Sequence, residues 1–130
     1  MLKSSAAWSI GGTMIRVIIK RQVTQEEKIS ELLRELRAAA TSHQGYMGGE
    51  TMVSTEDKRV ITVMGTWRSL IDWEEWKTSQ ERSEITKRIS PLLAAQPIVE
   101  TYELKPAEEL DFMEDPYGWL LVKEHTSFDG

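Results

Sequence analysis

Several residue types that carry chemistry in proteins are missing from this 130-residue chain, or nearly so. It has no cysteine, which excludes disulfides, thiolate nucleophiles, zinc–cysteine sites and cysteine-held iron–sulfur clusters. Its two histidines, His43 and His125, are too few and too far apart in sequence for a histidine-rich metal site. No run approaches the roughly 20 apolar residues that a membrane-spanning helix needs. We therefore expect a soluble protein without a metal centre.

Charge is distributed unevenly along the chain. Residues 1–104 carry 14 Lys and Arg against 14 Asp and Glu, whereas residues 105–130 carry two against seven and account for the net charge of −5. A neutral body with an acidic end offers no surface for nucleic acid or for an anionic membrane. Residues 1–13 lack the apolar core of a secretory signal. We expect them to be a flexible extension of a cytoplasmic protein.

The apolar patterns predict one domain of alternating strands and helices. Alternation and β-branched residues indicate four strands, at 14–21, 46–55, 59–67 and 98–104. The capping box 24-TQEE-27 and the apolar spacing after it predict a helix to about residue 40. A second helix should begin at Ser69 and end before Pro91, with a possible break near residues 78–79.

The resulting order, β-α-β-β-α-β, predicts an α+β domain of the ferredoxin-like type. In this fold a four-stranded antiparallel sheet carries both helices on one face. The other face has no covering element within the chain, although its residues are substantially apolar. A second copy packed sheet against sheet would bury it, so we expect a homodimer.

Four segments together resemble the antibiotic biosynthesis monooxygenase family of the dimeric α+β barrel group. They are MIRVIIKR at the first strand, GYMGGE at the second, VITVMGTWRSLIDWEEW across the third strand and second helix, and IVETYEL at the last. The resemblance covers about residues 14–104. It implies a ferredoxin-like homodimer. Some members of the family insert oxygen into polycyclic aromatic substrates without metal, flavin or haem, and others degrade haem.

Three of the five tryptophans, Trp67, Trp73 and Trp76, fall within ten residues. Helical spacing favours a core position for Trp73, and Trp67 is expected to wedge the helix against the strand end. The resemblance places Trp76 at the wall of a substrate pocket, a role that suits the flat apolar face and single N–H donor of indole. We expect a pocket of at least roughly 300 Å³ between the second helix and the sheet, lined by Trp76 with Trp67 nearby.

Polar residues that could serve such a pocket are few. His43 has the right ordinary pKa for a general base, although a histidine in such a loop more often faces solvent. Arg16 and Lys20 share the mixed face of the first strand, and Glu50 could join them at the substrate. Their charges would stabilise an enolate, but ion pairs within the barrel would explain the same residues. We name His43 and Trp76 as catalytic candidates and Arg16, Lys20, Glu50, Trp67 and Trp76 as substrate-binding candidates.

Haem degradation fits the sequence poorly. The resemblance implies an asparagine in the first strand, a tryptophan in the second helix and a histidine ten residues after it. Trp76 matches the tryptophan, but Thr86 stands at the histidine position and the first strand contains no asparagine. Threonine cannot ligate haem iron as imidazole does. We therefore expect no haem, and neither a metal nor another cofactor.

These observations favour a cofactor-independent monooxygenase-like enzyme that oxidises a small aromatic or polycyclic substrate. The main alternative is a non-catalytic dimeric module that binds a small hydrophobic ligand or a partner protein. Haem degradation ranks third. The acidic segment 105–130 contains a cluster of large apolar residues, from Phe112 to Val122, which is atypical of disorder. We expect it to dock as a C-terminal arm that crosses onto the partner subunit, or else to fold back over its own helices.

Overall fold

The computed structural model describes residues 13–24 and 26–106, without the side chains of residues 26 and 27. The expected N-terminal extension and nearly all of the C-terminal arm therefore lie outside the described residues. Within them the chain forms β1 (Ile15–Gln22), α2 (Glu26–Thr41), β2 (Tyr46–Val53), β3 (Val60–Trp67), α3 (Leu70–Lys77), α4 (Gln80–Ile89), the 3-10 turn η1 (Ser90–Leu92) and β4 (Ile98–Glu103). None of the described helices has the length and apolar character needed to cross a membrane.

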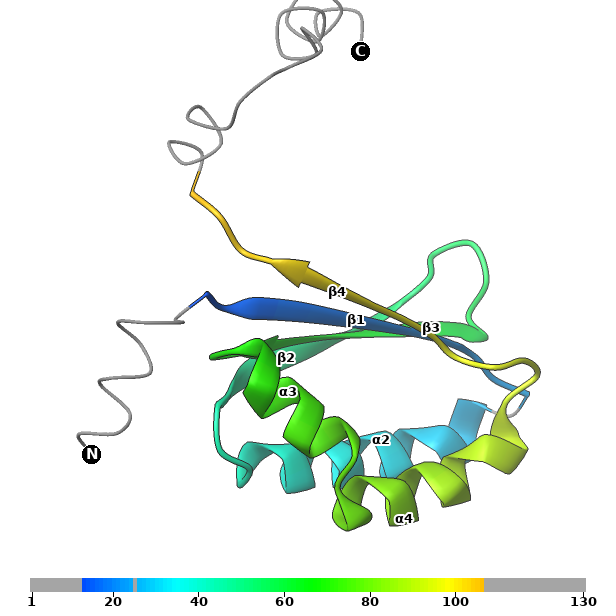
Figure 1. Cartoon of the computed structure of the whole chain (residues 1–130). Coiled ribbons are helices and arrows are strands. Elements are labelled where there is room, and N and C mark those ends of the chain that lie inside the picture. The colour runs from blue at the N-terminus through cyan, green and yellow to red at the C-terminus, as the bar shows by residue number, and fades with distance from the viewer. Residues whose placement is uncertain (1–12, 25, 107–130) are drawn as a thin grey trace, which may run out of the picture.

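The strands form one antiparallel sheet in the order β2-β3-β1-β4. The helices α2, α3 and α4 all lie on the same face of that sheet (Figure 1). This arrangement confirms the predicted α+β ferredoxin-like fold with its β-α-β-β-α-β order. The homodimer stays a prediction.

β1 separates the two faces of the sheet residue by residue. Ile15, Val17, Ile19 and Arg21 are buried beneath the helices, whereas the residues between them are half-buried or exposed on the opposite face. The side-chain period of two along a strand produces this division. Arg21 therefore occupies the fourth place in a row whose first three members are aliphatic.

The second predicted helix is divided in two at the position where the sequence suggested a break. Ser69 begins α3, and its hydroxyl accepts a hydrogen bond from the amide of Asp72 at 3.2 Å. Ser79 begins α4 in the same way and accepts from the amide of Arg82 at 3.1 Å. Serine satisfies otherwise unpaired amides at both helix starts. At the start of α2, the Thr24 hydroxyl donates to the carbonyl of Leu92 at 3.0 Å.

The interior has two parts. The aliphatic cluster consists of Val23, Ile29, Ile61, Ile85 and Ile89. The aromatic cluster contains three tryptophans together with aliphatic residues of β1 and α2, namely Ile15, Val17, Ile19, Ala40, Trp67, Trp73 and Trp76. The first joins α2 to α4, and the second joins α3 to the central strands β1 and β3.

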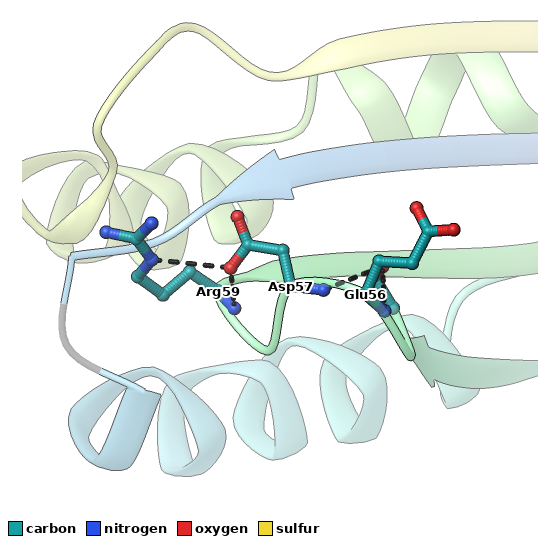
Figure 2. Close-up of polar contacts among 4 residues, drawn as sticks. Glu56, Asp57 and Arg59 are labelled. Carbon is teal, nitrogen blue, oxygen red and sulfur yellow. Dashed lines mark hydrogen bonds and ion pairs between the residues drawn. The ribbon is translucent and has the colours of Figure 1, made fainter.

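A short polar turn joins β2 to β3 (Figure 2). The Ser54 hydroxyl accepts from the amides of Glu56 and Asp57 at 3.1 and 3.2 Å. The Asp57 carboxylate accepts from the amide of Arg59 at 3.0 Å and from its Nε at 3.3 Å. These bonds lower the pKa of Asp57, the backbone bond most. The turn fixes the register in which β2 pairs with β3.

Candidate active site

A pocket lies between the sheet and the helices, and three indoles form much of its wall. Trp67 comes from the end of β3, and Trp73 and Trp76 come from α3. Each indole is at most 3% exposed to solvent, so the three residues belong to the core and to the pocket wall at once. We call this site the aromatic pocket; Val17 and Ile19 of β1 complete its apolar lining.

The rings of the wall hold one another in defined orientations. Trp67 and Trp76 stack with centroids 6.2 Å apart and an interplanar angle of 24°. Trp73 and Tyr46 meet Trp67 edge to face, at 6.0 and 5.1 Å. Such contacts stabilise aromatic pairs beyond the burial of their area. The wall is therefore a preformed apolar surface.

The aromatic pocket holds only about 60 Å³. Trp76 and Trp67 line it as predicted, but its volume is well below the roughly 300 Å³ expected for a ligand-sized site. The cause lies in the indoles themselves, because the three large rings fill most of the space between sheet and helices. A small molecule such as dioxygen fits in the remaining space, but a polycyclic substrate does not.

A larger hollow of about 440 Å³ lies between α4 and β4 and shares Ile19, Arg21 and Arg82 with the aromatic pocket. We call it the lateral cleft. Its other lining residues include Thr86, Lys87 and Ser90 near the end of α4, and Gln96, Pro97 and Val99 around the start of β4. Arg21 and Arg82 therefore stand where the small pocket meets a cleft large enough for a ligand.

Arg21 is a buried cation and Arg82 a half-buried one, and neither has an acidic partner among the described residues. Arg21 is 2% exposed, and its Nε and Nη1 find no hydrogen-bond acceptor in the described part of the chain. Burial and the nearby charge of Arg82 lower the pKa of Arg21 to about 10, so it is cationic at neutral pH. Arg82 stacks its guanidinium on Trp73, 5.5 Å from the ring centroid, and its buried Nε is likewise unpaired. Burial lowers the pKa of Arg82 as well.

A third guanidinium and a phenol line the opposite side of the aromatic pocket. Arg37 of α2 donates through Nη1 to the carbonyl of Gly49 at 3.2 Å and through Nη2 to the hydroxyl of Thr51 at 2.7 Å. The Tyr46 hydroxyl lies over Gly49, where an added Cβ would approach it to 2.7 Å. Burial raises the pKa of Tyr46, while the charge of Arg37 opposes the shift. Tyr46 is therefore a protonated phenol at neutral pH.

His43 lies behind the indole wall rather than inside the pocket. Its ring meets Trp76 at 5.2 Å and Trp67 at 6.4 Å between centroids, both edge to face. The half-buried ring leaves Nδ1 enclosed and without a hydrogen-bond partner among the described residues. It is packed in the loop between α2 and β2 instead of facing solvent, and it does not contribute to the pocket lining. A role as base stays a prediction.

Three binding candidates lie on the face of the sheet opposite the helices. Arg16 and Lys20 alternate with the buried row of β1, and Glu50 of β2 stands opposite Met64 on the same outer face. None of the three lines the aromatic pocket or the lateral cleft. Arg16 instead donates to the hydroxyl of Thr66 at 3.2 Å. Strand alternation turns them away from the helices and from Trp76. Whether they bind substrate stays a prediction.

Sequence reasoning overlooked Arg21 and Arg82, although the signal was present for both. Arg21 continues the inward row Ile15, Val17 and Ile19 by one more step of two. Arg82 precedes Ile85 by three residues and Ile89 by seven, which places it on the buried face of α4. Charged residues that continue an apolar period point to a functional site, because burying an unpaired charge is costly.

The described residues contain no group of three or more His, Asp or Glu side chains arranged to hold a metal ion. Thr86, at the position that the resemblance assigns to a haem-ligating histidine, lines the lateral cleft. Its hydroxyl donates to the carbonyl of Arg82 at 3.0 Å within α4. Whether haem binds stays a prediction.

The family model for antibiotic biosynthesis monooxygenases matches residues 14–88, which is more than half of the chain. No curated protein matches the sequence. Solved structures match in fold. A conserved protein from Methanosarcina mazei Go1 is 23% identical, with 72% of this chain and 94% of that chain covered and a TM-score of 0.64.

Two further solved structures are similar in fold at lower identity. A protein from Caulobacter crescentus CB15, described as an antibiotic biosynthesis monooxygenase, is 14% identical to this chain. The match covers 78% of this chain and 99% of that chain, with a TM-score of 0.68. A variant of SnoaB, a cofactor-independent oxygenase from Streptomyces nogalater, is 5% identical, covers 72% and 94%, and gives 0.66. At these identities the similarity concerns the fold alone.

Proposed function

Because this chain belongs to the antibiotic biosynthesis monooxygenase family, we propose that it is a cofactor-independent monooxygenase that acts on a small aromatic substrate with an acidic C–H group. The observation that carries the proposal is the aromatic pocket. It has an aromatic wall and room for dioxygen, and it is bordered by guanidiniums and a protonated phenol. The similarity in fold to SnoaB, a cofactor-independent oxygenase, supports it.

The proposed reaction needs no external reductant. Oxidation of an activated CH₂ group to a ketone by one dioxygen yields one water, so the substrate supplies all four electrons. Loss of a proton gives a carbanion, which reduces dioxygen and forms a C–O bond to a peroxide. Loss of the second C–H proton with cleavage of the O–O bond then releases water and leaves the carbonyl.

The residues around the aromatic pocket can promote each step. None of the described lining residues is a carboxylate or an imidazole, while Arg21, Arg37 and Arg82 all contribute positive charge. We propose that this charge lowers the pKa of the bound substrate, so that it loses its proton to water without a dedicated base. Tyr46, whose pKa is raised by burial, then donates a proton to the peroxide.

Oxygen uptake with anthrone, which yields anthraquinone and water, tests this proposal; the rings of anthrone are too large for the aromatic pocket and would lie in the adjoining lateral cleft. Uptake above the rate of protein-free autoxidation is expected from the intact protein, with anthraquinone formed in equal amount. Tyr46→Phe keeps the ring against Trp67 but removes the proton donor, and should lower the rate about 10²-fold or more. Tyr102→Phe is the matched control, because that exposed phenol bonds to Glu100 and lines neither the aromatic pocket nor the lateral cleft. Uptake no faster than autoxidation would refute the oxygenase with this substrate class.

We also propose that the protein acts as a homodimer formed through the outer face of the sheet. Ile98 and Met52 are exposed on that face, and Ile18 and Met64 lie between them on the central strands. An apolar sheet face of this kind is suited to a second copy of the chain. Sedimentation over a dilution series should give a dimer, which Ile98→Glu should weaken. A monomer at all concentrations would contradict the proposal.

A further inference from the structure

The pair Arg21 and Arg82 carries more positive charge than the proposed chemistry requires. Their guanidiniums lie close enough for the charge of Arg82 to lower the pKa of Arg21, and no described carboxylate offsets the repulsion. Removing an ion from water costs several kcal/mol unless a partner compensates it. Three donor nitrogens remain unpaired among the described residues: Nε and Nη1 of Arg21 and Nε of Arg82.

These donors suit one kind of ligand group. Guanidinium N–H groups pair with the two oxygens of a carboxylate in a planar, bidentate arrangement. A single alkoxide or enolate oxygen would leave some of the three donors unpaired. The pair also lines the lateral cleft, whose remaining described residues are apolar, hydroxyl or amide side chains together with Lys87, with no acid among them.

We propose that Arg21 and Arg82 form a carboxylate-binding subsite, and that the ligand of this protein is a flat aromatic carboxylic acid whose ring lies in the lateral cleft. Its carboxylate sits at the boundary with the aromatic pocket and pairs with both guanidiniums, which offsets one of their two charges and leaves one positive charge beside the pocket. The cleft of about 440 Å³ has room for the ring, which the aromatic pocket does not. The subsite stands on the structure by itself; only the statement that the ligand is a substrate rests on the proposed oxygenase function.

Calorimetric titration of the full chain with 1-naphthoate at pH 7.5 tests the subsite without any turnover. The neutral analogue 1-naphthalenemethanol has the same ring and should bind much more weakly. Arg21→Met and Arg82→Met each remove one charged donor, and each should raise the Kd for 1-naphthoate roughly ten- to hundredfold. Arg88→Met is the matched control: it removes a guanidinium from the same helix, but one that is exposed and paired with Glu35.

The pH dependence separates a bound carboxylate from a merely structural role of Arg21. The affinity of the intact protein for 1-naphthoate should fall as pH rises above 10, where Arg21 loses its proton, while the residual affinity of Arg21→Met should not follow the same curve. Equal binding of acid and alcohol, or binding by folded Arg21→Met and Arg82→Met equal to that of the intact protein, would overturn the subsite. Folding of each variant is checked by circular dichroism.

Failure of the two proposals can be told apart. If 1-naphthoate binds as described but no aromatic compound accelerates oxygen uptake, the subsite stands and the oxygenase proposal falls. If anthrone is oxidised rapidly, and both arginine variants bind 1-naphthoate and oxidise anthrone as the intact protein does, the oxygenase proposal stands and the subsite falls.

Discussion

The aliphatic and aromatic clusters fill two ends of one interior and differ in what they leave unsatisfied. The aliphatic cluster joins α2 and α4 through isoleucines and valine, and these side chains have no groups that need a hydrogen-bond partner. The aromatic cluster borders a cavity, the buried guanidinium of Arg21, the unpaired Nε of the half-buried Arg82 and an enclosed histidine nitrogen. One end is built for stability alone. The aromatic end keeps buried polar groups that lack partners and lower the stability of the fold. A bound ligand can pair with them, which is typical of functional sites.

The largest effect on stability should come from the aliphatic cluster. Ile29 is completely buried, and Ile29→Ala should lower the free energy of unfolding by about 2–5 kcal/mol through lost burial and the cavity left behind. Chemical denaturation measures the change. Ile71→Ala is the matched control, because Ile71 is 68% exposed and its truncation should change stability little. Comparable losses from both variants would contradict the contrast between buried and exposed isoleucines.

Arg21→Met should act in the opposite direction and increase stability. Replacing an unpaired buried charge by an apolar side chain of similar length removes a desolvation cost, and the gain should be about 1–4 kcal/mol. Binding of 1-naphthoate should be lost in the same variant. A variant less stable than the intact protein would show that Arg21 supports the fold after all.

The stability gain of Arg21→Met should also depend on pH. The pKa of Arg21 is about 10 in the folded protein against 12.5 ordinarily, so above pH 10 the unfolded chain binds more protons than the folded chain. The stability contribution of this group therefore rises with pH in that window, and the cost of the buried cation is fully present below it. The difference between Arg21→Met and the intact protein should be constant near neutrality and shrink above pH 10. Urea denaturation at pH 7.5 and pH 10.5 measures it.

Gly45→Ala should perturb the aromatic end more moderately. Gly45 has a φ of +89°, and an added Cβ would come within 2.3 Å of the Asp72 carboxylate. The left-handed backbone alone costs roughly 1–2 kcal/mol for other residues. We expect a loss of about 2 kcal/mol by thermal denaturation, with weaker packing of the neighbouring Tyr46 on Trp67. An unchanged midpoint would show that this loop does not hold the aromatic end together.

Most of the fold was predictable from the sequence, and the reason is periodicity. Alternation in β1, helical spacing in α2 and the capping serines of α3 and α4 each specify a local structure that tertiary packing then reinforces. Even the break at Ser79 was visible, because serine is a strong helix cap.

The candidate site was only partly predictable. Trp67 and Trp76 were identified as pocket residues. Arg16 and Lys20 were correctly placed on the mixed face of the first strand, but the sequence did not show that the indole-lined pocket lies under the opposite face. Arg21 and Arg82 stand at positions where the apolar period predicts a buried side chain, although both are charged. Because charged residues were assigned to the surface, these two were not recognised as pocket residues. The volume of the pocket depends on how three large rings pack together, which no local pattern encodes.

The smallest effect should come from the turn between β2 and β3, whose residues line neither the aromatic pocket nor the lateral cleft. The amide of Arg59 contributes most to lowering the pKa of Asp57, and its guanidinium assists. Because the folded pKa lies below the ordinary value of 3.8, the ionised carboxylate stabilises the folded state at neutral pH, and this contribution is lost as pH falls through the folded pKa. Asp57→Asn should therefore be slightly less stable than the intact protein at pH 7, and the difference should disappear in strong acid. Thermal denaturation from pH 7 down to about pH 2 measures the stability difference and its loss in acid. A difference that persists in acid would assign the loss to turn geometry instead of charge. Binding of 1-naphthoate at pH 7.5 should be unchanged in this variant.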